Sequence, residues 1–179
     1  MEKINQPEYW QRGPLPEIPP LLQPVAHALL QAREEVCDSM VEFPVDYLFD
    51  RPENMASCAY HLQHITGVLD RLFTYAREKS LSEEQLTYLE LEGKISSGLN
   101  TKNLIDLFSE QVDKAILQLK STETDTLTNY RPIGRRALPS TVIGLLFHAA
   151  EHIMRHIGQL YVTSRIVLTS RASSVKFTE

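Results

Sequence analysis

The fold is decided by one stretch, MASCAYHLQHITGVLDRLFTYA, which occupies residues 55–76. Hydrophobic residues recur through it at alternating intervals of three and four, which is the spacing of one helix face. These residues are Met55, Cys58, Leu62, Ile65, Leu69, Leu72 and Ala76. The pattern predicts a helix over about residues 54–79 that packs one face into a helical bundle.

Three further long helices are expected around this one. Hydrophobic spacing predicts them over about residues 21–36, 101–119 and 140–167, with Ser140 as the cap of the last. A short helix is expected after Ser82, whose hydroxyl can cap it. Eight of the ten prolines lie in the first 52 residues, so the middle of the chain is free to be helical. The predicted fold is an all-α four-helix bundle with long connecting loops.

The length of 179 residues suits one ordinary domain. We expect a proline-rich lead-in over residues 1–20, the bundle over residues 21–168 and a C-terminal tail over residues 169–179. The tail has little periodicity and is expected to be frayed or docked by a few side chains. Residues 121–139 are rich in turn-forming residue types and predict a long loop with room for a small hairpin.

The charge of the chain argues against several classes of function. Eighteen Lys and Arg stand against 23 Asp and Glu, and the net charge of -5 leaves no electrostatic footprint for nucleic acid or a membrane surface. No stretch approaches the roughly 20 apolar residues that cross a bilayer. Two cysteines are too few for a disulfide framework, which suits a reducing compartment. We expect a cytoplasmic protein that pairs as a homodimer through spare apolar helix faces.

Five of the six histidines fall in two groups, one in each of two predicted helices. His61 and His64 lie in the helix quoted above, and His148, His152 and His156 follow one another at intervals of four. Residues four apart share a helix face about 6 Å apart, and imidazole is the commonest metal ligand. His152 and His156 border the apolar stripe whereas His148 lies nearly opposite it, so His152 and His156 form the better ligand pair.

A third ligand is expected from the other group. His61 and His64 both lie on the flank of their own apolar face, and either can complete a set of three imidazoles. Three protein ligands leave coordination positions open for water or substrate. Each histidine taken alone also fits a packed or surface role, so the spacing by itself leaves metal binding open.

Two segments of the sequence resemble a known family. They are Ser57-Cys-Ala-Tyr-His-Leu-Gln-His64-Ile, followed by Leu69-Asp-Arg-Leu, and His148-Ala-Ala-Glu-His152-Ile-Met-Arg-His156-Ile-Gly-Gln159. Together they resemble the DinB-like (DinB/YfiT) superfamily, whose members are four-helix bundles with a metal held by three histidines. The resemblance extends over about residues 21–167, and only the two helical segments are specific.

The resemblance implies a ligand set. One family ligand follows a Ser by seven residues, which matches His64, and the other two stand four apart before x-Gly-Gln, which matches His152 and His156. His61 and Gln159 are expected in the pocket beside the metal, and His61 is the residue that could replace His64. Family members often carry two adjacent histidines where this chain has Arg155-His156, a departure that leaves the three ligands intact.

The resemblance also implies a chemistry. The expected cofactor is a divalent metal, zinc or nickel in the first place, with iron or manganese as further options. The expected reaction is hydrolysis or thiol-dependent S-transfer on a small molecule, since related bundles use low-molecular-weight thiols such as bacillithiol or mycothiol. The other hypothesis is a non-catalytic metal-binding or stress-response bundle that acts by interaction.

A basic turn provides one further candidate residue. Gly134-Arg135-Arg136 could bind an anionic substrate group at the mouth of the pocket, with Arg135 as the contact, or it could be an exposed basic loop. No phosphate loop, dinucleotide fingerprint or Gly-x-Ser-x-Gly motif is present in the sequence. Cys58 belongs to the apolar face of its helix, so it is not the expected nucleophile.

Overall fold

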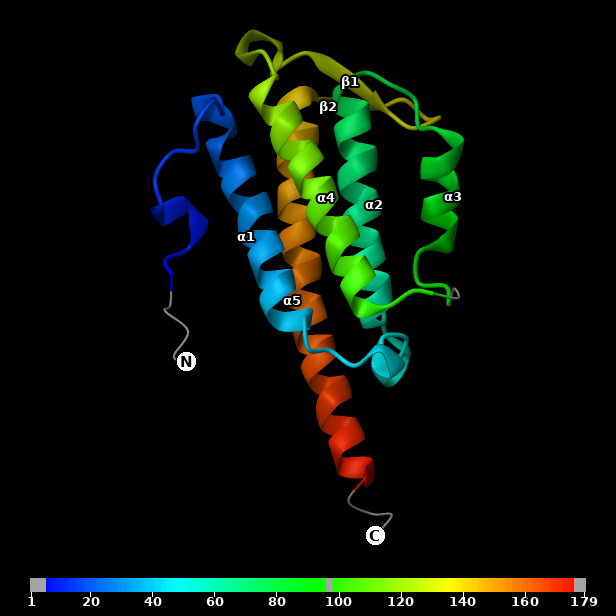
Figure 1. Ribbon diagram of the computed structural model, residues 1–179. Coiled ribbons are helices and arrows are strands. Elements are labelled where there is room, and N and C mark those ends of the chain that lie inside the picture. Colours follow the sequence, from blue (N-terminus) through cyan, green and yellow to red (C-terminus); the bar gives the residue numbers. More distant parts are fainter. Residues whose placement is uncertain (1–5, 96–97, 176–179) are drawn as a thin grey trace.

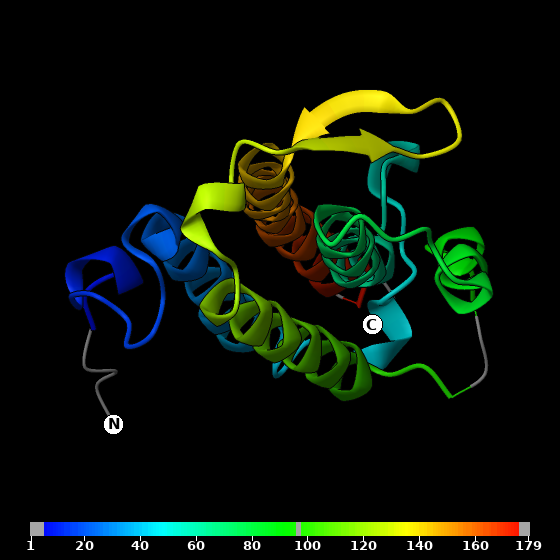
Figure 2. The ribbon, with the colours of Figure 1, turned by 90° about the horizontal axis from the view of Figure 1, so that it is seen from above.

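Four long helices surround one apolar core in the computed structural model, which describes residues 6–95 and 98–175. Helix α2 packs against α5 and α4, and α1 packs against the same two helices, so the four close into a ring (Figures 1 and 2). This arrangement confirms the prediction of an all-α four-helix bundle. The bounds are α1 (Gln23–Met40), α2 (Cys58–Ala76), α4 (Thr101–Lys120) and α5 (Val142–Val175).

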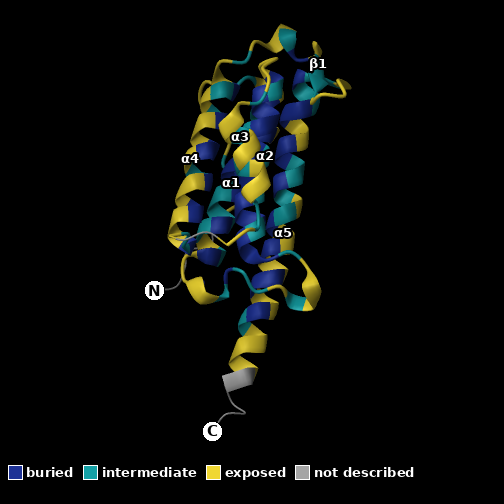
Figure 3. Cartoon of the chain, turned by 90° about the vertical axis from the view of Figure 1, so that its right-hand side faces the viewer, coloured by how far each residue is buried: buried dark blue, intermediate teal, exposed yellow. Residues whose placement is uncertain are grey.

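Helix α2 begins where the sequence provides a cap. The Ser57 side chain accepts a hydrogen bond from the backbone N–H of Tyr60, which satisfies one of the donors that a helix start leaves free. Most of the apolar face predicted from its spacing is buried, with Leu62 and Leu69 fully enclosed (Figure 3). Met55 is an exception, because it precedes the cap and leaves half of its surface exposed.

The described part of the lead-in, residues 6–20, lies against α1. A short 3-10 helix at Tyr9–Gln11 contacts α1, and the Arg12 guanidinium forms two hydrogen bonds with the Glu34 carboxylate at 2.9 and 2.8 Å. The Gln23 amide donates to the carbonyl oxygens of Leu15 and Ile18, both at 2.9 Å. Residues 1–5 of the expected lead-in and residues 176–179 of the expected tail lie outside the described residues.

The short helix expected after Ser82 is α3 (Glu83–Leu91), on the outer side of α2 (Figure 1). Its first turn forms a reciprocal capping box, because the Ser82 hydroxyl accepts from the Gln85 backbone and the Gln85 side chain accepts from the Ser82 backbone. Helix α3 buries no residue fully, so its contribution to the core is small. Its main effect is to bring the residues that follow it beside the middle of α2.

The loop before α5 contains the small hairpin that its length allowed. Strands β1 (Tyr130–Ile133) and β2 (Leu138–Thr141) pair antiparallel. The expected cap was wrong by one residue. Ser140 lies within β2, and the Thr141 hydroxyl instead accepts a hydrogen bond from the Gly144 backbone N–H at 3.1 Å.

Helix α5 is longer than expected. It continues to Val175, so the first seven residues of the expected tail are helical (Figure 1). No glycine or proline follows Gly158, so nothing in the sequence stops the helix. The Arg171 guanidinium also forms two 2.7 Å hydrogen bonds with the Asp50 carboxylate, which ties this extension to the segment before α2.

No helix within the described residues has both the length and the apolar character needed to cross a bilayer. The residues buried within the bundle are mainly apolar and come from all four long helices. Figure 3 shows that the buried residues of these helices lie on their inner sides and the exposed residues on their outer sides. This burial pattern is the one expected when amphipathic helices stabilise each other by removing apolar surface from water.

Replacing Leu69 by Ala is expected to lower the free energy of unfolding by about 2–5 kcal/mol, because the side chain is 0% exposed and its loss leaves a cavity. The matched variant Met55→Ala is expected to change it by about 0.5 kcal/mol or less, since Met55 is 50% exposed. Urea denaturation measures both. Equal losses in the two variants would contradict the assigned start of α2.

Candidate metal centre

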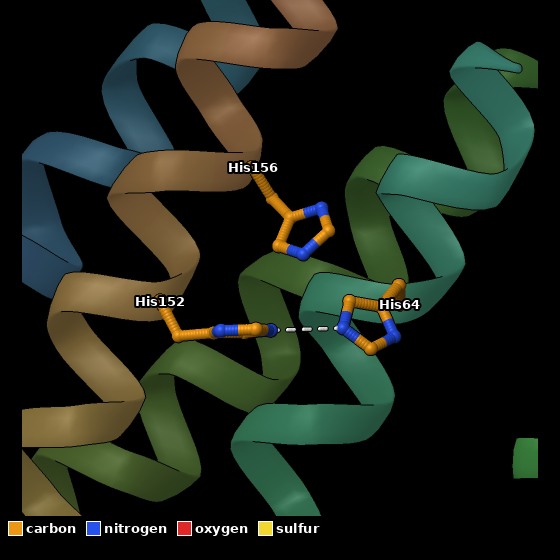
Figure 4. Close-up of side chains that lie close together, drawn as sticks. All are labelled: His64, His152 and His156. Atoms are coloured by element: carbon orange, nitrogen blue, oxygen red, sulfur yellow. Dashed lines mark hydrogen bonds between the residues drawn. The ribbon is translucent and has the colours of Figure 1, made fainter. Parts of the chain in front are cut away.

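Three histidines from two helices converge beside the core. His64 comes from α2, and His152 and His156 come from successive turns of α5 (Figure 4). One ring nitrogen of each lies within 4.8 Å of the other two. Nε2 of His64 and Nε2 of His152 lie 3.0 Å apart. At that separation the two nitrogens can share a proton or, when both are unprotonated, ligate one cation, since metal–nitrogen bonds of about 2.0–2.1 Å place neighbouring ligands at such distances.

The packing of α2 against α5 brings these rings together. Ile65 follows His64 and Ile153 follows His152, and both isoleucines are fully buried in the core to which α2 and α5 contribute. Each histidine therefore lies one position from a side chain that fixes the helix face, on the flank where the two helices meet. The spacing argument placed His64, His152 and His156 on these flanks, and the structure brings the three residues together.

A buried ion pair holds His64 from behind. Its Nδ1 lies 2.6 Å from Oε2 of Glu92, and Nη1 of Arg71 donates to the other carboxylate oxygen at 2.7 Å. The Glu92 side chain is 4% exposed, so this contact is shielded from water. A carboxylate that accepts the Nδ1 proton leaves the Nε2 lone pair of His64 free to face the other two histidines.

Glycine at position 67 makes room for that ion pair. A Cβ atom there would lie 2.5 Å from Nη1 of Arg71 and 2.5 Å from Oε1 of Glu92, closer than atoms of these types approach. A glycine inside a helix costs stability relative to alanine, and here the close approach of the two charged groups explains it. Sequence analysis missed Glu92 and Arg71, although an isolated glycine in a strongly patterned helix is a signal of close approach.

Two neighbouring rings complete the surroundings of the histidines. Tyr60 stacks on His64 with the ring centroids 5.3 Å apart and the planes 8° from parallel. His61 is 4% exposed, and its Nδ1 lies 3.0 Å from Nδ1 of His156. His156 therefore has its second nitrogen, Nε2, left for a metal. His61 contacts a ligand candidate and does not replace His64 in the converging set.

Burial favours the neutral form of His61, His152 and His156. It lowers the pKa of His156 to about 4, with further lowering by His64 and His152. It also lowers the pKa of His61 to about 4, and it moves the pKa of His152 in the same direction. Neutral imidazole is the form that ligates metals, so the donor set fits a divalent cation at neutral pH. Nδ1 of His152 is buried and has no hydrogen-bond partner among the described residues.

A second group of metal-ligating side chains shares one residue with the first. His148, Glu151 and His152 also offer ligand atoms within 4.8 Å of one another. His148 is exposed, as the helix geometry predicted, and its Nδ1 lies 2.7 Å from the Glu151 carboxylate. Arg155 contacts the other carboxylate oxygen at 2.5 Å. The Glu151 carboxylate already has two partners, His148 and Arg155, and both are exposed to solvent. The set of His64, His152 and His156 is therefore the better candidate for a metal site.

The two other predicted pocket residues lie in different places. Gln159 is exposed and lines a cavity together with His61, one turn along α5 from His156. Arg135 is exposed in the hairpin turn and lines a separate pocket with Tyr75 and Glu78. Tyr75 is eleven residues beyond His64 on α2, about 16 Å along the helix axis. Arg135 therefore does not lie at the mouth of the histidine site, because the hairpin packs at the far end of α2.

These features define a class of protein. It is a four-helix bundle in which two adjoining helices bring three histidines together at a site that could hold a metal ion. The chain belongs to the DinB superfamily, whose family model matches residues 17–160. A similar solved structure is that of a conserved protein from Enterococcus faecalis, with a TM-score of 0.68 and 17% identity over 83% of this chain and 97% of that chain. This likeness concerns the fold. The search of curated proteins found no match.

Replacing Glu92 by Gln is expected to weaken metal binding about 10-fold to 100-fold, because the neutral amide holds the Nδ1 proton of His64 less strongly than a carboxylate. Competition with a chelating dye measures the affinity. Glu90→Gln is the matched control, since Glu90 is an exposed residue of α3. Equal affinities in the wild type and Glu92→Gln, with both folded, would contradict this role for Glu92.

Proposed function

We propose that this protein is a metal-dependent enzyme in which His64, His152 and His156 hold one divalent cation beside a small-molecule substrate. The observation that carries the proposal is the convergence of three imidazole nitrogens from two helices within 4.8 Å. Three protein ligands are the number used by catalytic zinc sites, which keep a further position for water or substrate. Zinc or nickel suits an all-imidazole donor set best, and iron and manganese follow.

The residues around the site support a bound cation. Glu92 accepts the Nδ1 proton of His64, and Nδ1 of His61 contacts Nδ1 of His156. The rings of His64 and His156 are therefore each oriented by a partner on the side away from the metal. A divalent cation held there supplies Lewis acidity, which favours the deprotonated form of a water molecule or thiol near neutral pH. The proposed reactions are therefore hydrolysis and thiol S-transfer.

The nucleophile is proposed to come from solvent or from a substrate. Cys58 is fully buried in the core, and burial raises the pKa of its thiol to about 12, so it remains a neutral thiol at neutral pH. The converging histidine group contains no cysteine among the described residues. In an S-transfer reaction the reacting thiol would accordingly be a low-molecular-weight cosubstrate bound beside the histidines.

Metal content tests the ligand set. Protein purified without an affinity tag or chelator is expected to hold near-stoichiometric divalent metal, and His156→Ala is expected to lose most of it. His148→Ala is the matched control, because His148 and His156 each lie four residues from His152 on the same helix, and only His156 belongs to the converging set. Elemental analysis of the folded variants measures this. Loss of metal in His148→Ala with retention in His156→Ala would contradict this ligand set and would indicate that the metal binds at His148, Glu151 and His152.

Turnover tests the enzyme proposal. The metal-loaded protein is screened with activated esters, and with electrophiles in the presence of low-molecular-weight thiols, against His156→Ala as the blank. Turnover in the wild type alone is the expected result. Stoichiometric metal with equal rates in both proteins across both reaction classes would contradict catalysis and favour a binding role.

A further inference from the structure

One cavity opens beside the metal centre on the outer face of α5. Its volume is about 590 Å³, within the range of about 300–1,000 Å³ that small-molecule pockets occupy. Apolar side chains and backbone from α5 and from the segment before α2 form most of its wall. These residues are Met55, Ala56, Gly158, Val162 and Ile166, and we call the cavity the α5 pocket.

Several of its apolar side chains are exposed without a covering element. Val162 is 56% exposed, Met55 is 50% exposed and Ile166 is 39% exposed. Exposed aliphatic side chains that cluster around a cavity lose unfavourable contact with water when a ligand fills it. Gly158 lines the pocket, and a Cβ there would meet no atom within 4 Å.

One residue links the α5 pocket to the metal centre. His61 lines the pocket, and its Nδ1 lies 3.0 Å from Nδ1 of His156. A molecule in the pocket could therefore contact the His61 imidazole, which in turn contacts one of the converging histidines. Mostly apolar walls that end beside groups capable of chemistry are the usual arrangement of a substrate site.

Polar groups also line the pocket. Arg155, Gln159 and Thr163 lie on α5 at the helical spacing of one flank. Arg155 and Gln159 are exposed and form the margin of the pocket, whereas Thr163 is buried. Arg155 already contacts Glu151 at 2.5 Å, so its remaining guanidinium protons are the ones available to a ligand. The margin thus offers hydrogen-bond donors and one positive charge to a polar end of the ligand.

We propose that the α5 pocket binds the apolar portion of the substrate, a small molecule that joins an alkyl or aromatic group to a polar reacting end. The substrate role rests on the proposed function, because it assumes that the reacting end lies at His64, His152 and His156. The ligand class follows from the walls, which are aliphatic, and from the margin, which provides donors. The separate pocket of Arg135 is lined by charged residues such as Glu78 and Lys79 and lies far from the histidines.

A series of straight-chain carboxylates tests the pocket directly. Butanoate, hexanoate and octanoate share one head group and differ only in alkyl length, so their relative affinities isolate burial of the chain. Affinity is expected to rise up to about fourfold for each added methylene that is buried. Chemical-shift titration of both the metal-loaded and the metal-free protein measures it.

Two variants and one control locate the binding. Val162→Asp places a carboxylate in the pocket at an exposed position, and Gly158→Leu fills the pocket with an apolar side chain where the backbone has room. Both are expected to abolish the dependence of affinity on chain length. Leu117→Asp introduces the same charge at another exposed helical position, on α4, and is expected to keep that dependence.

The outcomes separate the pocket from the metal. Equal affinities along the series, or a chain-length dependence that survives in both pocket variants, would overturn the pocket whether or not metal is present. Chain-length-dependent binding to a protein that takes up no metal would keep the pocket and reject the proposed function. The inference is supported if Val162→Asp and Gly158→Leu lose the dependence of affinity on chain length while the wild type and Leu117→Asp keep it.

Discussion

The packing of α2 against α5 is the constraint on which the rest of the structure depends. It forms much of the apolar core, and the same contact fixes the height and rotation at which the histidines of the two helices meet. Close-packed helices transmit small displacements, since interiors contain few voids to absorb them. The convergence of the three histidines is therefore a consequence of core packing, and Glu92, in the segment after α3, adds a contact that orients the His64 ring.

Much of the fold could be predicted because α-helices have a simple period. The spacing of apolar residues in α2 indicated the buried face, and the positions of His152 and His156 relative to that of α5 indicated the flank on which they lie. The errors fell at helix ends, where single side chains decide the outcome. Thr141 caps α5 in place of Ser140, and Met55 lies before the start of α2.

The parts of the site that could not be predicted are contacts across long sequence separations. Glu92 lies 28 residues beyond His64, after the short helix α3, and no spacing rule joins the two residues. Gly67 is the local feature of the sequence that indicated a close approach at this point, because a Cβ there would clash with Arg71 and Glu92. Arg135 shows the opposite case, because its basic turn suggested a ligand contact while the hairpin places it at the other end of α2. Periodicity identifies faces, and only the tertiary fold shows which loops cover them.

Burial has two consequences at this site that act together. It lowers the pKa of His61 and His156, which favours the neutral form that ligates metals, and it shields the contact between His64 and Glu92 from water, which strengthens that interaction. The ion pair of Glu92 and Arg71 is buried without leaving an unpaired charge, because each partner neutralises the other. The protein thus combines an apolar neighbourhood with oriented ligands, the combination that a Lewis-acid site requires.

X-ray absorption of the metal-loaded protein tests the central claim most directly. We expect three imidazole nitrogens at about 2.0–2.1 Å from the ion, the distance typical of zinc, together with at least one oxygen ligand from water. A first coordination sphere with fewer than three imidazoles, or with a sulfur ligand in protein free of added thiol, would contradict the assignment of His64, His152 and His156 as the metal site.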